Sequence, residues 1–104
     1  MDGKKATRYS VHYNHVTNHP SVIYDYDGMK ITSVGLTHSD HTKGRSNVPL
    51  KKNPIQGDNR KSFALVIPQY LNQRTYDPYV LSHIWDEGDR EIIDFIATKK
   101  IRIH

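Results

Sequence analysis

The stretch VIYDYDGMKITSVGL, residues 22–36, decides the expected fold. Val22–Tyr26 and Met29–Leu36 are rich in β-branched and aromatic residues, and Asp27-Gly28 lies between them. Two such runs around Asp-Gly predict an antiparallel hairpin, because a type I′ turn needs positive φ at both central residues. Residues 22–36 therefore predict two adjacent antiparallel strands.

Upstream of this hairpin, residues 8–14 alternate between apolar and polar side chains. This period of two predicts a first strand with one buried face, formed by Tyr9, Val11 and Tyr13, and one polar face, formed by Ser10, His12 and Asn14. Residues 14–21 contain Asn18 and Pro20 and predict a turn. Residues 1–7 are polar and basic, and we expect them to fray.

Downstream, residues 63–67 form a continuous apolar run that ends at Pro68, which predicts a central strand buried on both faces. Tyr79–Leu81 predicts a shorter extended segment. Residues 86–94 are rich in acidic side chains, with apolar residues at helical spacing and Lys99-Lys100 behind them. This pattern predicts an amphipathic helix from Asp89 to Lys99 with Asp89 as N-cap, and Trp85 packing across the sheet.

These elements predict one α+β domain spanning residues 1–104, with a small, curled, SH3-like antiparallel sheet of four to five strands and a C-terminal helix. The sequence has no Cys, which excludes disulfides and thiolate chemistry. It also lacks an apolar run of the roughly 20 residues that cross a membrane, so we expect no membrane partner and a cytoplasmic location.

The segment HSDHTKGRSNVPLKKNPIQGDNRKS, residues 38–62, is basic and has no apolar period. It carries six Lys or Arg residues against two Asp residues, an excess equal to the formal net charge of +4 of the whole chain. Connections of this length are commonly functional, and clustered Lys and Arg attract phosphates. We therefore expect a long basic loop between the third and fourth strands that binds nucleic acid, RNA in preference to DNA.

This segment and the residue before it contain the groups that metal-independent RNA cleavage needs: a base, an acid and cations on the phosphate. Imidazoles exchange protons near neutral pH, Arg holds a phosphate bidentately, and hydroxyl groups donate to an anionic oxygen. No cofactor or metal is required. The candidate catalytic residues are Thr37, His38, Ser39, His41, Lys43 and Arg45, and the candidate nucleic-acid-binding residues are Lys51, Lys52, Arg60 and Lys61.

Other interpretations of these residues stay open. A basic loop with glycines can be only a solvated loop, and its histidines can serve to hydrogen-bond backbone. For Asp58 we favour a structural role over a catalytic one, in which it pairs with Arg60 and fixes the loop. His38-x-x-His41 is a weak metal pattern, because zinc sites need three or four ligands on fixed elements. Core or cross-strand packing is the expected role of four tyrosines: Tyr9, Tyr13, Tyr24 and Tyr26.

Three function hypotheses follow. The first is an RNA-binding protein that acts as a metal-independent endoribonuclease. The second is a non-catalytic accessory protein that binds DNA or RNA with the same cations but without the histidines. The third is a protein-interaction module, which would have little affinity for polyanions even at low salt. The sequence is compatible with either a monomer or a homodimer, because the edge strands of a small sheet can pair between two copies of the chain.

The motifs VGLTHS at 34–39, NVPLKKNP at 47–54 and DNRKSF at 58–63, followed by SHIW at 82–85, resemble short uncharacterised proteins of bacterial phages, plasmids and conjugative elements. More distantly, Leu36-Thr37-His38-Ser39 with Lys43 is similar to the lysine-rich turn of endoribonuclease toxins of the ToxN and AbiQ type. That resemblance implies an SH3-like barrel, RNA cleavage, an antitoxin as partner, and roles at the cutting site for Thr37, Ser39 and Lys43.

Overall fold

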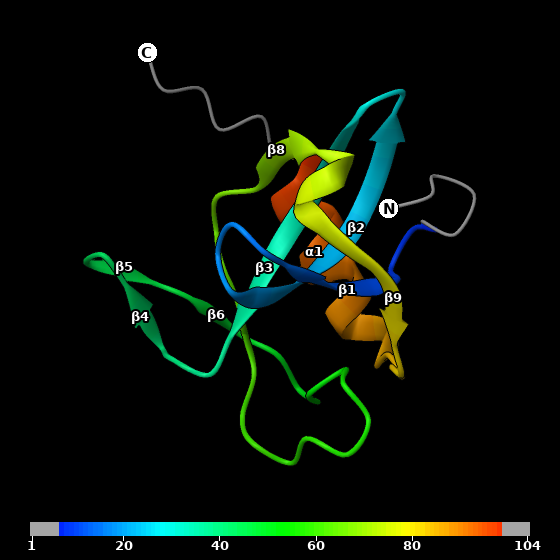
Figure 1. The fold of residues 1–104 in the computed structure, drawn as a ribbon. Helices are drawn as coiled ribbons and strands as arrows, with labels where there is room; N and C mark the ends of the chain where they lie inside the picture. Colours follow the sequence, from blue (N-terminus) through cyan, green and yellow to red (C-terminus); the bar gives the residue numbers. More distant parts are fainter. Residues whose placement is uncertain (1–6, 99–104) are drawn as a thin grey trace.

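The computed structural model describes residues 7–98 as an antiparallel sheet with one α-helix against it (Figure 1). The α+β class and the C-terminal helix are therefore confirmed, but the expected four to five strands are too few, because among these residues the main sheet has seven strands and a separate two-stranded sheet lies beside it. The expected fraying of residues 1–6 and the helix end at Lys99 lie outside the described residues. In chain order the elements are β1 (Val11–Asn14), β2 (His19–Asp27), β3 (Lys30–Thr37), β4 (His41–Thr42), β5 (Arg45–Ser46), β6 (Val48–Pro49), β7 (Phe63–Ala64), β8 (Gln69–Asn72), the 3-10 helix η2 (Gln73–Thr75), β9 (Tyr76–Leu81) and α1 (Glu87–Thr98).

The β2–β3 hairpin lies at the centre of the sheet, whose strand order is β6-β7-β3-β2-β1-β9, with β8 on the other half of β3. Asp27 pairs with Lys30, so the two turn residues are Gly28 and Met29. Only Gly28 has positive φ, at +60°, which is the pattern of a type II′ turn. The hairpin is confirmed, but the predicted type I′ turn at Asp27-Gly28 is wrong, because Asp27 still belongs to the ladder.

β1 is buried on both faces, which corrects the predicted polar face at Ser10, His12 and Asn14. It lies between β2 and β9, and the side chains of His12 and Asn14 are completely buried. Their polar atoms are paired inside the protein: His12 contacts Ser10 Oγ at 3.1 Å and the Asp77 carbonyl at 2.9 Å. Burial lowers the pKa of His12. Alternation in the sequence thus marks the strand but does not show that a second layer covers its polar side.

The predicted central strand at 63–67 is confirmed only for Phe63–Ala64, which form β7 between β6 and β3, and its extension to Ile67 is wrong. β7 ends at Ala64, which pairs with Leu36, and the ladder to β3 resumes only where Gln69 pairs with Ser33. The residues between bulge away from the sheet, and Ile67 is 36% exposed. Gly35 makes room for this bulge, since a Cβ on Gly35 would lie 2.5 Å from Leu65 Cδ1. An apolar run alone does not reveal such a break in register.

α1 packs against β2 and β3 and contributes Ile93 and Ile96 to the core. Trp85 packs on the same core and donates from Nε1 to the Tyr9 carbonyl at 2.8 Å. The predicted N-cap at Asp89 is wrong, because the helix begins two residues earlier, at Glu87. Asp86 takes the capping role, accepting from Asp89 N through both its carbonyl and its carboxylate. No helix within residues 7–98 has the length and apolar character needed to cross a bilayer.

Candidate nucleic-acid interface

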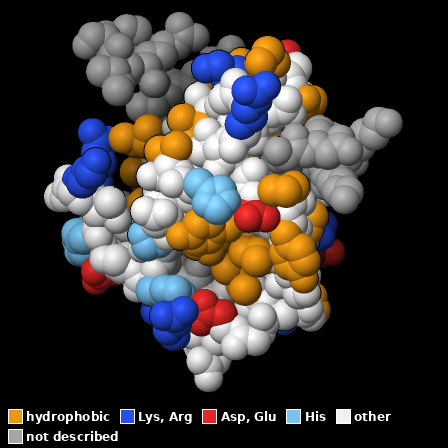
Figure 2. Space-filling model, in the orientation of Figure 1, with side chains coloured by type: hydrophobic (Ala, Val, Ile, Leu, Met, Phe, Trp, Pro, Cys, Tyr) orange, Lys and Arg blue, Asp and Glu red, His pale blue; other side chains and the backbone are white. Residues whose placement is uncertain are grey.

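Residues 38–62 are divided into two parts rather than forming one long loop. The first is the β4–β5 hairpin, which projects from the sheet, and the second is the segment 50–62, which we call the loop (Figure 1). β6 connects them. In the view of Figure 2, His side chains lie beside Lys and Arg side chains on the part of the surface that carries the hairpin and the loop.

The loop is fixed by hydrogen bonds to its backbone. The Asp89 carboxylate at the start of α1 accepts from Lys51 N at 2.9 Å and from Lys52 N at 3.1 Å, and Asp89 is only 1% exposed. Asn53 binds across the loop, donating to the Arg60 carbonyl at 2.9 Å and accepting from Ile55 N at 3.0 Å. The side chains of Lys51 and Lys52 therefore extend from fixed positions, because their backbone is held by the helix.

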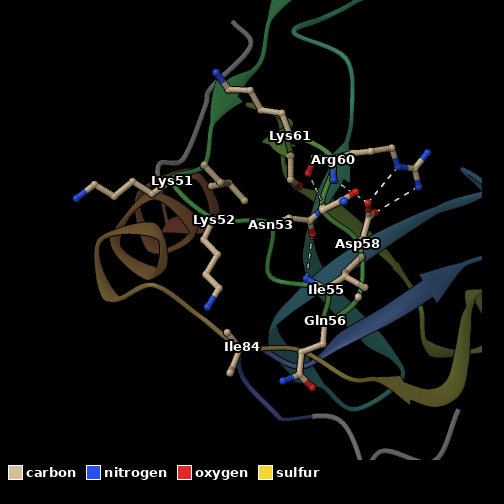
Figure 3. A pocket seen from close by; sticks show the side chains of 13 residues that line it. Lys51, Lys52, Asn53, Ile55, Gln56, Asp58, Arg60, Lys61 and Ile84 are labelled. Carbon is tan, nitrogen blue, oxygen red and sulfur yellow. Dashed lines mark hydrogen bonds and ion pairs between the residues drawn. The ribbon is translucent and has the colours of Figure 1, made fainter.

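A cavity of about 610 Å³, which we call the cradle, is enclosed by the loop and Ile84. All four predicted nucleic-acid-binding residues line it: Lys51, Lys52, Arg60 and Lys61. Figure 3 shows the three lysines pointing in different directions, all of them away from Arg60, which turns to Asp58. Within residues 7–98 these lysines have no ion-pair partner. No residue of α1 lines the cradle, so the acidic helix holds the loop without covering its cations.

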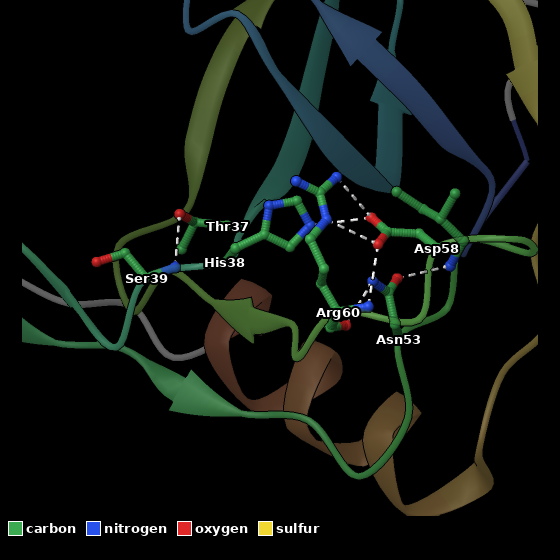
Figure 4. Close-up of polar contacts among 7 residues, drawn as sticks. Thr37, His38, Ser39, Asn53, Asp58 and Arg60 are labelled. Atoms are coloured by element: carbon green, nitrogen blue, oxygen red, sulfur yellow. Dashed lines mark hydrogen bonds and ion pairs between the residues drawn. The ribbon is translucent and has the colours of Figure 1, made fainter.

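Asp58 joins the loop to the end of β3 (Figure 4). Its carboxylate contacts His38 Nε2 at 2.9 Å and accepts from Arg60 Nε at 3.0 Å, so the predicted pairing with Arg60 is confirmed. Hydrogen bonds from Arg60 and then from His38 hold the pKa of Asp58 well below its usual range. Asp58 thus stays ionised at neutral pH and orients the imidazole of His38, whose side chain is 40% exposed.

The residues after His38 use their hydroxyl groups inside the turn. Thr37 Oγ1 accepts from Ser39 N at 3.2 Å, and Ser39 Oγ donates to the His41 carbonyl at 2.7 Å. The hydroxyl proton of Ser39 is therefore engaged in holding the entry to β4. His41 pairs with its neighbour Asp40 at 3.0 Å, and both side chains are largely exposed.

Lys43 and Arg45 lie on the hairpin, away from the cradle. Thr42 pairs with Arg45, and Lys43 and Gly44 form the turn with φ of +50° and +78°, the pattern of a type I′ turn. Both cations line a second concavity that shares no lining residue with the cradle. Six of the ten candidate residues thus line two separate concavities, four in the cradle and Lys43 and Arg45 in the other. Of the remaining four, which line neither, His38 contacts Asp58 of the cradle.

Two residues that build this interface were missed from the sequence. Asp89 was expected only as a helix cap, and Asn53 only as part of a turn. The Asn53-Pro54 pair is a turn signal that points to Asn53. Asp89 has no comparable signal, because its partners are backbone N–H groups of distant residues. Within the described part of the chain, no three His, Asp or Glu side chains are grouped so as to hold a metal ion.

Comparisons with protein-family models, with curated proteins and with solved structures found no match for this chain.

Proposed function

We propose that this protein binds RNA through the cradle, with Lys51, Lys52 and Lys61 on the phosphates. One observation carries this proposal: three lysines without an ion-pair partner within residues 7–98 extend from a fixed loop around one concavity. Lysines that are not neutralised by carboxylates keep their full potential for phosphates, and binding releases the counterions of the nucleic acid. The fixed backbone reduces the ordering cost of binding.

A salt titration tests this proposal. The variant Lys51→Gln/Lys61→Gln should bind single-stranded RNA more weakly, and the slope of log K against log salt should become shallower by about 1.4, as expected for two lost phosphate contacts. Lys30→Gln/Arg74→Gln is the control with the same loss of charge, placed away from the cradle. Equal slopes for the cradle variant and the wild type would contradict the proposal. DNA of the same sequence shows whether RNA is preferred.

The His38–Asp58 pair favours a second candidate function, metal-independent cleavage of the bound RNA. Asp58 holds Nε2 of His38, and Nδ1 has no partner within residues 7–98. A neutral imidazole held in this way can take the proton of a ribose 2′-hydroxyl with Nδ1. The 2′-oxygen then attacks the phosphorus, the bond to the 5′-oxygen breaks, and the leaving 5′-oxygen takes a proton from solvent water. Cleavage would leave a 2′,3′-cyclic phosphate and a 5′-hydroxyl end.

Cleavage is tested with labelled RNA in the presence of a metal chelator. His38→Gln should lower the rate by about 10²- to 10⁴-fold, the usual contribution of a general base. His41→Gln is the matched control, since His41 is also paired with an aspartate but lies on the hairpin. Equal residual cleavage by wild type and His38→Gln would assign the activity to a contaminant. If the protein binds RNA but does not cleave it, cleavage is rejected and RNA binding through the cradle is retained.

Several sequence-based expectations join this proposal as predictions. They are an origin in a mobile element, an antitoxin partner, a cytoplasmic location and an SH3-like curl of the sheet. Among the hypotheses, RNA binding is favoured over a plain protein-interaction module because the cradle lysines have no ion-pair partner within residues 7–98, although Lys61 Nζ lies over the Phe63 ring.

A further inference from the structure

The second concavity, which we call the groove, lies between the β4–β5 hairpin, the β1–β2 turn and residues 65–69. Its volume is about 570 Å³. Lys43 and Arg45 line it on the hairpin side, and the described residues that line it include no Asp or Glu. Its apolar part is formed by four aliphatic side chains: Val16, Leu65, Val66 and Ile67. The groove therefore offers an apolar floor beside two cations with no carboxylate partner.

Two side-chain amides also line the groove, and internal hydrogen bonds fix their orientation. Gln69 Oε1 accepts from the buried Asn14, which leaves the Gln69 Nε2 donor without a partner in the described chain. Asn47 Nδ2 donates to the Ser39 carbonyl and to Thr42 Oγ1, which leaves the Asn47 Oδ1 acceptor without one. Since no buried side-chain N or O atom of residues 7–98 lacks a partner, both free atoms reach the surface.

We propose that the groove binds an unpaired nucleobase of the RNA held in the cradle, with Lys43 and Arg45 on the adjacent phosphate; this inference rests on the proposed function. A nucleobase has apolar faces for the aliphatic floor and an edge with both donors and acceptors for Asn47 and Gln69. Its phosphate supplies the charge that the two cations need. An acidic peptide is the competing occupant, since its carboxylates suit the two cations and its backbone N–H groups can donate to Asn47 Oδ1; the peptide arm of the test below addresses it.

The cradle and the groove are close together along the chain, so a single RNA strand can bind to both. Asn47 in the groove and Leu50 in the cradle flank β6, and three extended residues span about 10 Å. A strand of RNA bound along this connection can place phosphates at the loop and a base in the groove. Because paired bases are not available to such a groove, the protein selects single-stranded RNA.

Binding of two probes tests the inference: a short single-stranded RNA of mixed sequence, and the same backbone with abasic riboses. Wild type should bind the intact RNA about tenfold more tightly, because one base contact of this kind is worth a factor of that order. Ile67→Asp should lose this preference but still bind the abasic probe through the cradle. Met29→Asp is the control, since Met29 is also exposed and apolar but lies on the β2–β3 turn.

Equal binding of both probes by wild type would overturn the inference and leave the proposed function intact. By contrast, a Lys51→Gln/Lys61→Gln variant that binds both probes like wild type would contradict the proposed function itself. A third arm uses a synthetic peptide of alternating Leu and Glu. If that peptide binds wild type but not Ile67→Asp, and no preference for the intact RNA is found, the groove is a protein-docking site and the inference fails.

Discussion

The loop at 50–62 and the β4–β5 hairpin come from one basic stretch, but they are held in different ways. The loop depends on distant residues, because the Asp89 carboxylate of α1 accepts from Lys51 N and Lys52 N. The hairpin depends on its own residues, through the Lys43-Gly44 turn and the bonds of Ser39 and Asn47. The same composition thus gives one surface coupled to the core and one surface supported locally.

Because the two regions are held differently, a substitution in each should lower a different measured quantity. Damage to the loop should reach the whole fold, because its anchor, Asp89, is a buried residue of the helix that packs on the core. Damage to the hairpin should remain local and appear in binding more than in the free energy of unfolding.

Asp89→Asn should lower the free energy of unfolding by about 3 kcal/mol, because one buried charged acceptor is lost and the new NH₂ group faces a backbone donor. Affinity for the abasic RNA probe should fall with it, since the cradle loses its anchor. Urea denaturation and anisotropy measure the two effects. Glu91→Gln, at an exposed carboxylate on the same helix, is the charge-matched control. Equal stability of both variants would show that the loop is not coupled to the core.

Gly57→Ala and Gly44→Ala form the most direct test of the comparison. Both glycines have positive φ, +85° in the loop and +78° in the hairpin, and a Cβ on either would meet no atom within 4 Å. The cost is therefore one of backbone conformation, about 1–2 kcal/mol. In the loop it should lower the global free energy of unfolding. In the hairpin, Gly44→Ala should instead increase local opening, which hydrogen exchange measures, and leave the global free energy of unfolding unchanged. The variant should also lose the preference for intact RNA over the abasic probe.

The parts of the fold that could be predicted are those with local signals. Residues 22–36 predicted the hairpin because both strands and their turn are contiguous, and the segment at 86–94 predicted a helix from its own spacing. The register break after Ala64 could not be predicted, because it depends on how β3 pairs with both β7 and β8. For the same reason, the burial of His12 was missed: β9, far along the chain, covers it.

The candidate site followed the same rule. Charge and residue type indicated the cations and His38, and the expected pairing of Asp58 with Arg60 is a contact between residues two apart. The division of 38–62 into hairpin and loop was missed, although Lys43-Gly44 is itself a short turn signal. The Asp89 anchor could not be predicted. Its partners are the backbone N–H groups of Lys51 and Lys52, which are 38 and 37 positions away in the chain, and such contacts leave no pattern in the sequence.

Asp58→Asn tests the part of the loop that is held by its own residues. The folded state holds the pKa of Asp58 well below its usual range, so Asp58 stabilises the fold above about pH 4, its unfolded pKa. This contribution is lost as the pH falls through the folded pKa. At pH 7 the variant should be less stable by about 1 kcal/mol, allowing for solvent screening. The difference, measured by urea denaturation, should shrink below pH 4; a constant difference would contradict this account.

Lys43→Asn should change stability and RNA binding in opposite directions: the hairpin should become slightly more stable and RNA binding weaker. Lys43 has φ of +50°, a region that Asn adopts more readily than Lys, so the variant should be more stable by about 0.5 kcal/mol or less. One phosphate contact is lost, so the slope of log K against log salt should become shallower by about 0.7. Lys30→Asn, in the regular ladder of β3, is the control and should lose stability. A destabilised Lys43→Asn would show that the hairpin depends on more than its own turn.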